Sequence, residues 1–335
     1  MRHKRRILTM TPRVSILIPA HNAGKWISQT IQSAAEQTWQ RKEIIIVDDG
    51  SSDDTLTIAR RLASPNISIL SQPNLGASAA RNTAYAHCQG DYIQWLDADD
   101  LLAPDKITKQ MESLRLCETS RSLLSCAWGR FIKRPARAKF TPTALWCNLS
   151  PVEWMLRKME QNIYIQTTAW LVSRELTDAA GPWDTRLWVD DDGEYFSRVI
   201  LASDNVRFVP GSKTYYRMSG SGSLSQIGLS KRKSDAQLLS VELNISHLLS
   251  VDCSERARNA CLTYLQMYVT YLCPQDPALV ERAERLAASL GGMIGPPQLS
   301  WRFSWIKTVI GLNAAKKARF HFRRLMNSLL KAIDR

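Results

Sequence analysis

The sequence has no run of about eighteen apolar residues, so no segment of it is expected to span a membrane. Its seven cysteines are scattered and include no C-x-x-C pair, which argues against a disulfide framework and a thiolate zinc site. Only 15 glycines and 14 prolines are present, which excludes collagen-like and low-complexity chains. Since 44% of the 335 residues are apolar, we expect a folded globular protein with reduced cysteines, located in the cytoplasm.

The net charge of the chain is +13, but most of the chain carries no excess of positive charge. Residues 1–13 contribute +5 and residues 301–335 contribute +8, which leaves residues 14–300 neutral. The main domain is therefore not expected to present a basic face to nucleic acid. No apolar stretch of signal-peptide length follows the basic N-terminus, so export is not expected.

The first part of the chain alternates short β-branched runs with helical stretches, which is typical of a largely parallel sheet covered by helices. Strands are expected there at 14–18, 43–47, 67–70 and 91–96, and helices at 26–37, 55–63 and 77–88. Beyond residue 105 the pattern becomes mainly helical. In that part we expect strands at 165–172 and 206–210, an exposed loop at 133–139, and helices at 236–249, 254–271 and 279–289.

Three of the early strands run into polar loops, which are Pro-Ala-His-Asn at 19–22, an acidic loop at 48–54 and Asp-Ala-Asp-Asp at 97–100. The ligand crevice of an open α/β sheet lies beyond the carboxyl ends of its strands, so these loops are expected to meet. Two carboxylates, Asp97 and Asp99, can hold a hard divalent cation, and a carboxylate in the second loop can read a nucleobase. The alternative is that these acids form turns and cap the helices that follow.

The order and spacing of four motifs resemble the family 2 glycosyltransferases of the GT-A fold. They are PAHN at 19–22, VDDGSSDDT at 47–55, QPNLGASAARN at 72–82 and LDADD at 96–100. The resemblance covers about residues 13–220. It implies inverting transfer of a sugar from a nucleotide-sugar donor, with Mg²⁺ or Mn²⁺ as cofactor.

The same resemblance implies roles for the residues that would bind the nucleoside of the donor. Pro19, Ala20 and Asn22 would line the nucleoside pocket. Asp49, or in second place Asp48, would contact the base.

Four further residues are assigned by resemblance to the nucleotide and its diphosphate. Arg81 would lie near the nucleotide, although it can equally form a salt bridge from helix to sheet. Asp97 would hold the ribose or belong to the metal shell, and Asp99 would ligate the metal. Arg217 would meet phosphate from a segment that covers the donor, unless that segment is an ordinary surface loop.

The catalytic base is expected in a second acidic cluster at 190–192, which resembles the stretch of the family that precedes a short helix ending in arginine. Alignment on Arg198 places Asp192 at the base position and Asp191 directly before it. Such a carboxylate would take the proton of the acceptor hydroxyl. The alternative is an acidic helix N-terminus that the helix dipole favours.

The last residues of the chain are predicted to form a basic amphipathic helix, because apolar and basic side chains recur there at helical spacing. Such a helix can lie on the cytoplasmic face of an anionic membrane, which would suit a lipid-linked acceptor. Alternatively, its apolar stripe packs on the domain.

The predicted fold class is therefore α/β, a Rossmann-like GT-A mixed sheet of the nucleotide-diphospho-sugar transferases with a C-terminal helical appendage. The predicted parts are a basic tail at 1–12, the GT-A domain at 13–228, a helical region at 229–290 and the basic amphipathic tail at 298–335.

The predicted function is that of a hexosyltransferase-like enzyme that moves a sugar, foremost from a UDP-sugar, to a glycan or lipid-linked acceptor in cell-surface polysaccharide biosynthesis. No Q-x-x-R-W motif follows the acidic clusters, which favours single-sugar transfer over a processive synthase. The alternatives are a non-catalytic nucleotide-sugar-binding protein and, in last place, a nucleic-acid binder that uses its basic tails.

Overall fold

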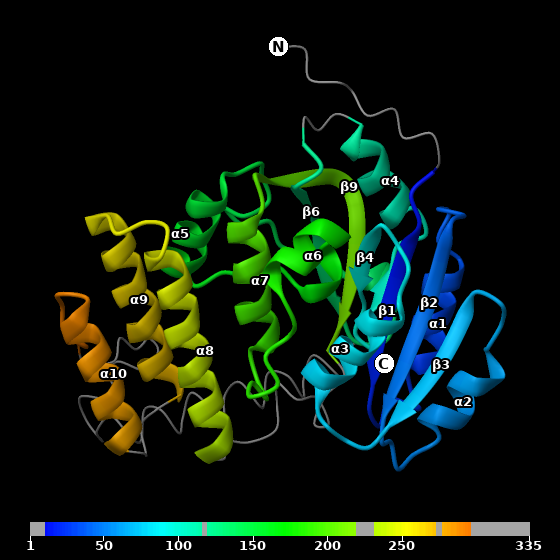
Figure 1. Cartoon of the computed structure of the whole chain (residues 1–335), viewed down its shortest axis with the longest axis horizontal. Helices are drawn as coiled ribbons and strands as arrows, with labels where there is room; N and C mark the ends of the chain where they lie inside the picture. Colours follow the sequence, from blue (N-terminus) through cyan, green and yellow to red (C-terminus); the bar gives the residue numbers. More distant parts are fainter. Residues whose placement is uncertain (1–10, 116–118, 219–230, 273–276, 296–335) are drawn as a thin grey trace.

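The computed structural model describes residues 11–115, 119–218, 231–272 and 277–295. Nearly all of the tail predicted at 1–12 and all of the tail predicted at 298–335 lie outside these ranges, as does the predicted boundary at residue 228. The described chain forms two β-sheets, and three long helices stand together at one end of the molecule (Figure 1). Among the described helices, none combines the length and the apolar character needed to cross a bilayer.

The first sheet has the strand order β3-β2-β1-β4-β8. Its strands are β1 (Val14–Ala20), β2 (Lys42–Asp49), β3 (Ile67–Gln72), β4 (Tyr92–Trp95) and β8 (Val172–Ser173). The first four run parallel and β8 runs antiparallel, so the predicted early strands are all present. Parallel strands end at the same edge, and this places the loops after β1, β2 and β4 together.

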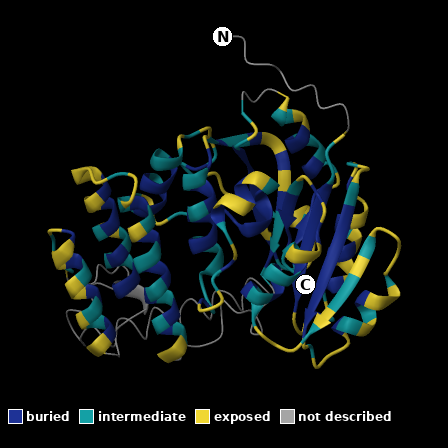
Figure 2. Ribbon diagram, viewed as in Figure 1, coloured by how far each residue is buried: buried dark blue, intermediate teal, exposed yellow. Residues whose placement is uncertain are grey.

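Helices cover both faces of the first sheet. They are α1 (Ile27–Ala35), α2 (Thr55–Arg61) and α3 (Ala77–His87). Successive side chains of a strand point to opposite faces. Leu17 therefore packs in the hydrophobic cluster that contains α3, whereas Ile16 and Ile18 pack in the cluster that contains α1 and α2. As a result β1 and β2 are buried along nearly their whole length (Figure 2).

The second sheet has the order β5-β9-β6-β7. Its strands are β5 (Leu101–Leu102), β9 (Asn205–Arg217), β6 (Ser122–Phe131) and β7 (Lys139–Phe140). β6 and β9 are parallel, with a register shift between Cys126 and Ala127. Since β5 follows the aspartates of 97–100 directly and pairs with the end of β9, the second sheet fixes this acidic loop.

The remaining helices include α4 (Lys106–Leu114), α5 (Pro151–Gln161), α6 (Arg174–Ala180), α7 (Asp191–Ala202), α8 (Lys231–Leu249), α9 (Glu255–Leu272) and α10 (Pro277–Ser289). Short 3₁₀ turns occur at Pro135–Arg137 and Thr167–Ala169. One hydrophobic cluster runs from Leu17 in β1 through Trp170 to Leu265 in α9 and Leu290 after α10. The C-terminal helices therefore share a core with the first sheet.

Two expectations about strands are wrong. β6 is a ten-residue strand in a region for which only helix was expected, and its sequence SLLSCAWGRF contains no β-branched residue. The strand expected at 165–172 is a 3₁₀ turn followed by the two-residue β8. This segment crosses between the sheets, since Leu171 bridges to β6 while Val172 pairs with β4, so it cannot extend along either.

A buried lysine lies where the two sheets approach each other. The Lys106 ammonium donates to the carbonyl oxygen of Trp170 at 3.0 Å and to the side-chain oxygen of Gln94. Its side chain is fully buried, and the loss of water lowers the pKa of Lys106 to about 7.

We predict that the free energy of unfolding rises with pH from about 7 to about 10, because the unfolded lysine still binds a proton over this range and the folded one does not. Lys106→Met should remove a slope of up to ~1.4 kcal/mol per pH unit. Urea unfolding at pH 7, 8 and 9 measures how the free energy of unfolding changes with pH. Lys109→Met, on the exposed side of the same helix, is the control and should keep the wild-type slope. An unchanged slope in Lys106→Met would contradict the prediction.

Candidate active site

One buried arginine joins the two predicted acidic segments. Arg81 on α3 donates from Nη2 to Asp97 Oδ1 at 2.9 Å and from Nη1 to Asp191 Oδ2 at 2.5 Å. Its side chain is 7% exposed, and its guanidinium lies 4.3 Å from the ring centre of Trp183. Burial alone would lower the pKa of Arg81, but Asp191 and Asp97 outweigh it and raise that pKa. The salt bridge from helix to sheet considered for Arg81 is present in its pair with Asp97.

The loop after β4 brings three aspartates together. Asp97 and Asp99 are half-buried and Asp100 is fully buried. Burial raises the pKa of Asp97, with Arg81 opposing and Asp99 reinforcing the shift. Burial, and then the charge of Asp99, raises the pKa of Asp100 well above its usual range. A cation beside this loop would relieve the repulsion that these groups share.

Arg217, at the end of β9, holds the same loop from its other side. Its backbone N–H donates to Asp100 Oδ1 at 2.8 Å, and its Nε donates to the carbonyl oxygen of Asp99 at 2.7 Å. The guanidinium lies 4.3 Å from the ring centre of Trp26 and 4.5 Å from that of Phe131. Arg217 is 1% exposed, so in this structure it fixes the position of Asp99. Its contact with phosphate stays a prediction.

The donor set fits a metal that relies on its substrate for most of its ligands. Within the described part of the chain, no group of three or more His, Cys, Asp or Glu side chains could hold a metal ion. Mg²⁺ is commonly held by one or two carboxylates together with water and substrate phosphates. Asp97 and Asp99 match that pattern, since they offer two adjacent, partly accessible carboxylates.

The three consecutive aspartates at the start of α7 point in three directions. Asp190 has a left-handed backbone (φ 56°), and its Oδ2 accepts from Ser240 Oγ of α8 at 2.7 Å. Asp191 turns toward α3, where it pairs with Arg81 and accepts from Ser78 at 3.1 Å. Asp192 Oδ2 accepts from the hydroxyl of Thr167 at 3.0 Å.

The environments of Asp191 and Asp192 differ in a way that affects proton transfer. Asp191 accepts a hydrogen bond from a cation, the guanidinium of Arg81. The contacts of Asp192 are the Thr167 hydroxyl and the N–H of Gly193, both neutral. Burial and then repulsion from Asp191 raise the pKa of Asp192. A raised pKa makes Asp192 a stronger proton acceptor than an ordinary aspartate.

The Asp49 carboxylate holds the loop after β3. Its Oδ1 accepts from Gln72 Nε2 at 2.7 Å and from the N–H of Leu75 at 2.9 Å, and its Oδ2 accepts from the N–H of Gly76 at 2.8 Å. Asp48 is also buried, and its Oδ1 has no hydrogen-bond partner among the described residues. Asp49 therefore shapes the loop, while one buried oxygen of Asp48 receives no donor from the residues that the structure describes.

The loop after β1 is tied to the loop after β2. Pro19 and Ala20 are buried at the end of β1, whereas Asn22 is exposed and has a left-handed backbone (φ 49°). The side-chain oxygen of Asn22 accepts from the N–H of Ser52 at 2.8 Å, and its own N–H donates to Ser51 Oγ at 3.0 Å. The predicted nucleoside residues thus lie at one sheet edge beside Asp48 and Asp49.

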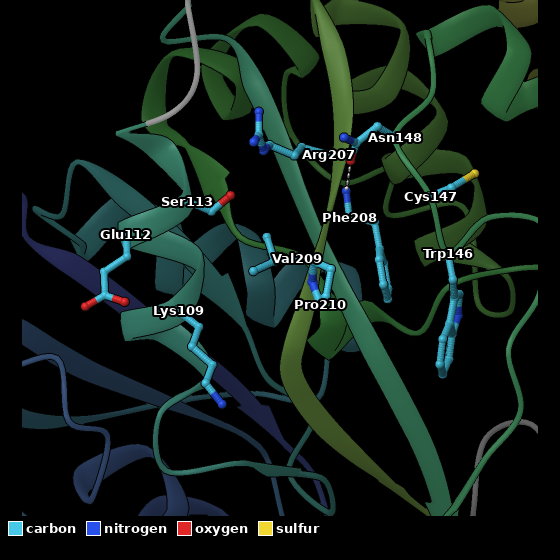
Figure 3. A pocket seen from close by; sticks show the side chains of 10 residues that line it. All are labelled: Lys109, Glu112, Ser113, Trp146, Cys147, Asn148, Arg207, Phe208, Val209 and Pro210. Atoms are coloured by element: carbon cyan, nitrogen blue, oxygen red, sulfur yellow. Dashed lines mark hydrogen bonds between the residues drawn. The ribbon is translucent and has the colours of Figure 1, made fainter.

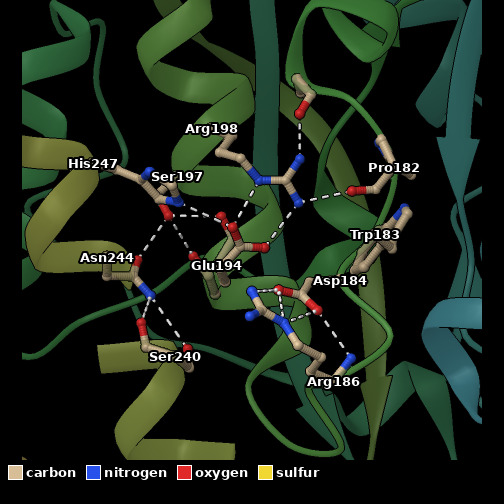
Figure 4. Close-up of polar contacts among 12 residues, drawn as sticks. Pro182, Trp183, Asp184, Arg186, Glu194, Ser197, Arg198, Ser240, Asn244 and His247 are labelled. Carbon is tan, nitrogen blue, oxygen red and sulfur yellow. Dashed lines mark hydrogen bonds and ion pairs between the residues drawn. The ribbon is translucent and has the colours of Figure 1, made fainter. Parts of the chain in front are cut away.

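The start of α7 is also held by α8 and α5. The side-chain oxygen of Asn244 accepts from Lys158 Nζ at 2.8 Å and from Ser197 Oγ at 2.7 Å. Lys158 Nζ also donates to the carbonyl oxygen of Gly193 at 3.1 Å. Figure 4 shows Ser240 and Asn244 of α8 facing the first turns of α7. Gly193, which follows Asp192, is therefore held by Lys158 of α5, and Asn244 of α8 holds Lys158 in turn.

A buried ion pair supports the next turn of α7. Glu194 is 2% exposed and accepts from Arg198 Nε at 2.7 Å and from His247 Nε2 at 3.0 Å (Figure 4). The supporting residues of α8, namely Ser240, Asn244 and His247, were missed from the sequence, since the region after residue 229 contains no motif. A lone polar residue within a helical pattern gives no signal of its contacts.

An open cavity of about 660 Å³ is lined by residues of α4, of β9 and of the segment before α5 (Figure 3). Trp146 and Phe208 stack at its wall, with ring centres 5.6 Å apart. Phe208 pairs with Ser125 and Arg217 pairs with Phe131, so six steps along β6, or about 20 Å, separate the cavity from the end of β9. None of the predicted site residues lines it.

Comparison with known sequences supports the predicted resemblance. Residues 15–178 match glycosyl transferase family 2, which confirms it. An E. coli chondroitin synthase is 43% identical over 110 residues. The aligned part is 32% of this chain and 16% of that synthase. The family match ends before Asp191 and Asp192, so the base is not covered by it.

Comparison with solved structures supports the predicted fold. S. aureus TarS 1–349 in complex with UDP-GlcNAc has a TM-score of 0.67 at 15% identity, over 83% of this chain and 81% of that chain. The mannosyltransferase PcManGT from Pyrobaculum calidifontis, in complex with GDP-Man and Mn²⁺, has a TM-score of 0.52 at 18% identity, over 92% of this chain and 86% of that one. The α/β GT-A fold class is confirmed.

We predict that Arg81→Met lowers the free energy of unfolding by about 3 kcal/mol at pH 7, because it leaves Asp97 and Asp191 close together without a cation. Urea unfolding measures this loss. The triple variant R81M/D97N/D191N should recover most of it. Arg285→Met, which breaks an exposed ion pair with Glu281, is the control and should cost far less. A loss in Arg81→Met no larger than in that control would contradict the prediction.

Proposed function

We propose that this chain is a metal-dependent, inverting glycosyltransferase that uses a nucleotide-sugar donor. The proposal starts from the match of residues 15–178 to glycosyl transferase family 2. The observation that carries the proposal is the bridge made by Arg81. It joins Asp97, in the loop expected to face the donor diphosphate, to Asp191, beside the predicted base. Donor and acceptor chemistry would thereby meet at one point.

The nucleoside would bind at the edge formed by the loops after β1 and β2. Pro19, Ala20 and Asn22 lie there, and Asp48 and Asp49 end the neighbouring strand β2. Asp49 would contribute by holding the loop after β3 beside the proposed nucleoside site. UDP-GlcNAc and GDP-Man in the similar structures support a nucleotide-sugar donor.

Asp97 and Asp99 would hold a divalent cation, Mg²⁺ or Mn²⁺. When bound, this cation neutralises charge on the departing nucleoside diphosphate. The three neighbouring carboxylates of this loop and the Mn²⁺ in the PcManGT complex support that assignment. Arg217 would keep Asp99 in place through its carbonyl oxygen.

Asp192 would act as the general base. It takes the proton of the acceptor hydroxyl as that oxygen forms a bond to the anomeric carbon, while the bond from this carbon to the diphosphate oxygen breaks. Attack from the face opposite the leaving group inverts the anomeric centre. Asp191 would contribute by holding Arg81, and Thr167 would orient Asp192.

The acceptor would be a glycan or a lipid-linked glycan in polysaccharide biosynthesis. The chondroitin synthase similarity supports polysaccharide chemistry. The basic tail at 298–335 would bring the enzyme to the cytoplasmic face of an anionic membrane, where a lipid-linked acceptor lies.

A donor screen tests the proposed reaction. The protein is incubated with Mn²⁺ and a panel of UDP-, GDP- and dTDP-sugars, and nucleoside diphosphate release is recorded. We predict release from one nucleotide class. The dissociation constant of that diphosphate should rise about tenfold in Asp99→Asn with Mn²⁺ and stay unchanged in EDTA, because Asp99 acts through the metal. Equal affinity of the two proteins for the diphosphate with Mn²⁺ would contradict the metal assignment.

We predict that Asp192→Asn lowers kcat at least ~100-fold and leaves donor binding within about twofold of wild type, because the amide cannot accept the proton. The rise of kcat/KM with pH should also disappear. Asp204→Asn, at an exposed position remote from the acidic clusters, is the matched control and should keep wild-type kcat. A nucleotide-sugar-binding protein without turnover would instead bind donor and release no diphosphate in any variant.

A further inference from the structure

A basic pocket of about 670 Å³ adjoins the segment that carries the predicted base. Its wall includes Arg186 and Trp188 from the loop before α7, Arg232 from α8 and Arg282 from α10. Asp235 is the acidic residue in this wall, which therefore contains more cations than carboxylates.

Trp188 places this pocket beside the site. It precedes Asp190 by two residues and Asp192 by four. A Cβ atom on Gly76 would lie 4.0 Å from Cη2 of Trp188, and the N–H of Gly76 donates to Asp49. Trp188 thus extends from the loop that Asp49 holds to the pocket wall.

The cations of the pocket differ in how far their charge is already balanced. Arg186 forms a two-pronged ion pair with Asp184, and Arg282 pairs with Glu242. Arg232 lies 3.9 Å from the ring centre of Trp188, is exposed, and forms no ion pair among the described residues. Its guanidinium is held on an aromatic face with its donors available.

We propose that this pocket binds an oxyanion of the acceptor, a phosphate or a carboxylate that lies near the hydroxyl to be glycosylated. The proposal rests on the proposed function, since it assigns the acceptor side of the same site. A planar guanidinium presents parallel N–H donors that match both oxyanions. The proposed function places the donor diphosphate at the cation held by Asp97 and Asp99. The charge of Arg232 is therefore assigned to a second anionic group, on the acceptor.

Three sugars that differ mainly at carbon 6 provide the probes, namely glucose 6-phosphate, glucuronic acid and glucose. Their binding to the full chain is measured by saturation-transfer NMR, first alone and then with saturating UDP and Mn²⁺ to occupy the donor site. We expect at least one charged sugar to bind about tenfold more tightly than glucose under both conditions. Tighter binding of glucose 6-phosphate identifies phosphate as the group bound, and tighter binding of glucuronic acid identifies carboxylate.

Arg232→Gln should reduce that preference to within about twofold, and Arg232→Lys should restore part of it. Arg258→Gln on α9 makes the same change of charge at an exposed position and should keep the full preference. Thermal unfolding of each variant checks its fold.

Equal binding of the three sugars, or a full preference in Arg232→Gln, would overturn the proposal. Binding of UDP, GDP and dTDP with Mn²⁺ is measured separately in the wild-type protein. Binding of none of the three would count against the proposed function, whereas the preference for charged sugars tests the pocket with or without a nucleotide.

Discussion

The site depends on a single buried cation between carboxylates from two distant parts of the chain. Asp97 lies in the loop after β4 and Asp191 is the first residue of α7, so the fold brings together two groups that repel each other. Their burial is tolerable only with a counter-charge of fixed geometry, and the guanidinium of Arg81 supplies one donor to each. The orientation of α3 on the first sheet thereby sets the distance between the two acidic segments.

Arg81 does not balance all of the charge around it. Burial raises the pKa values of Asp97, Asp100 and Asp192, with neighbouring aspartates adding to each shift. A fold that needed only stability would replace such groups with neutral ones. Their retention in one cluster is the pattern expected where a cation and a transferable proton are to be accommodated.

The parts of this arrangement that could be predicted from the sequence are those encoded locally. The β-branched runs of β1 and β2 mark strands, and acids at strand ends lie at one edge because the strands are parallel. β6 contains no β-branched residue and so gave no such signal. It is a strand because it pairs with β7 on one side and β9 on the other. The contacts of Asn244 and Lys158 could not be predicted either, because polar pairs between distant helices leave no periodic pattern.

The start of α7 shows why three identical residues in succession can be given different roles. Successive positions of a helix are turned by about 100°, and Asp190 departs further through its left-handed backbone. Asp190 consequently meets a hydroxyl of α8, Asp191 a guanidinium and Asp192 a threonine. Asp191 pairs with Arg81, while the hydrogen bonds of Asp192 come from neutral donors. Burial and then repulsion from Asp191 raise the pKa of Asp192, although the charge of Arg81 opposes the shift. The proposed division between a carboxylate that holds Arg81 and one that accepts a proton rests on these surroundings rather than on the residue type.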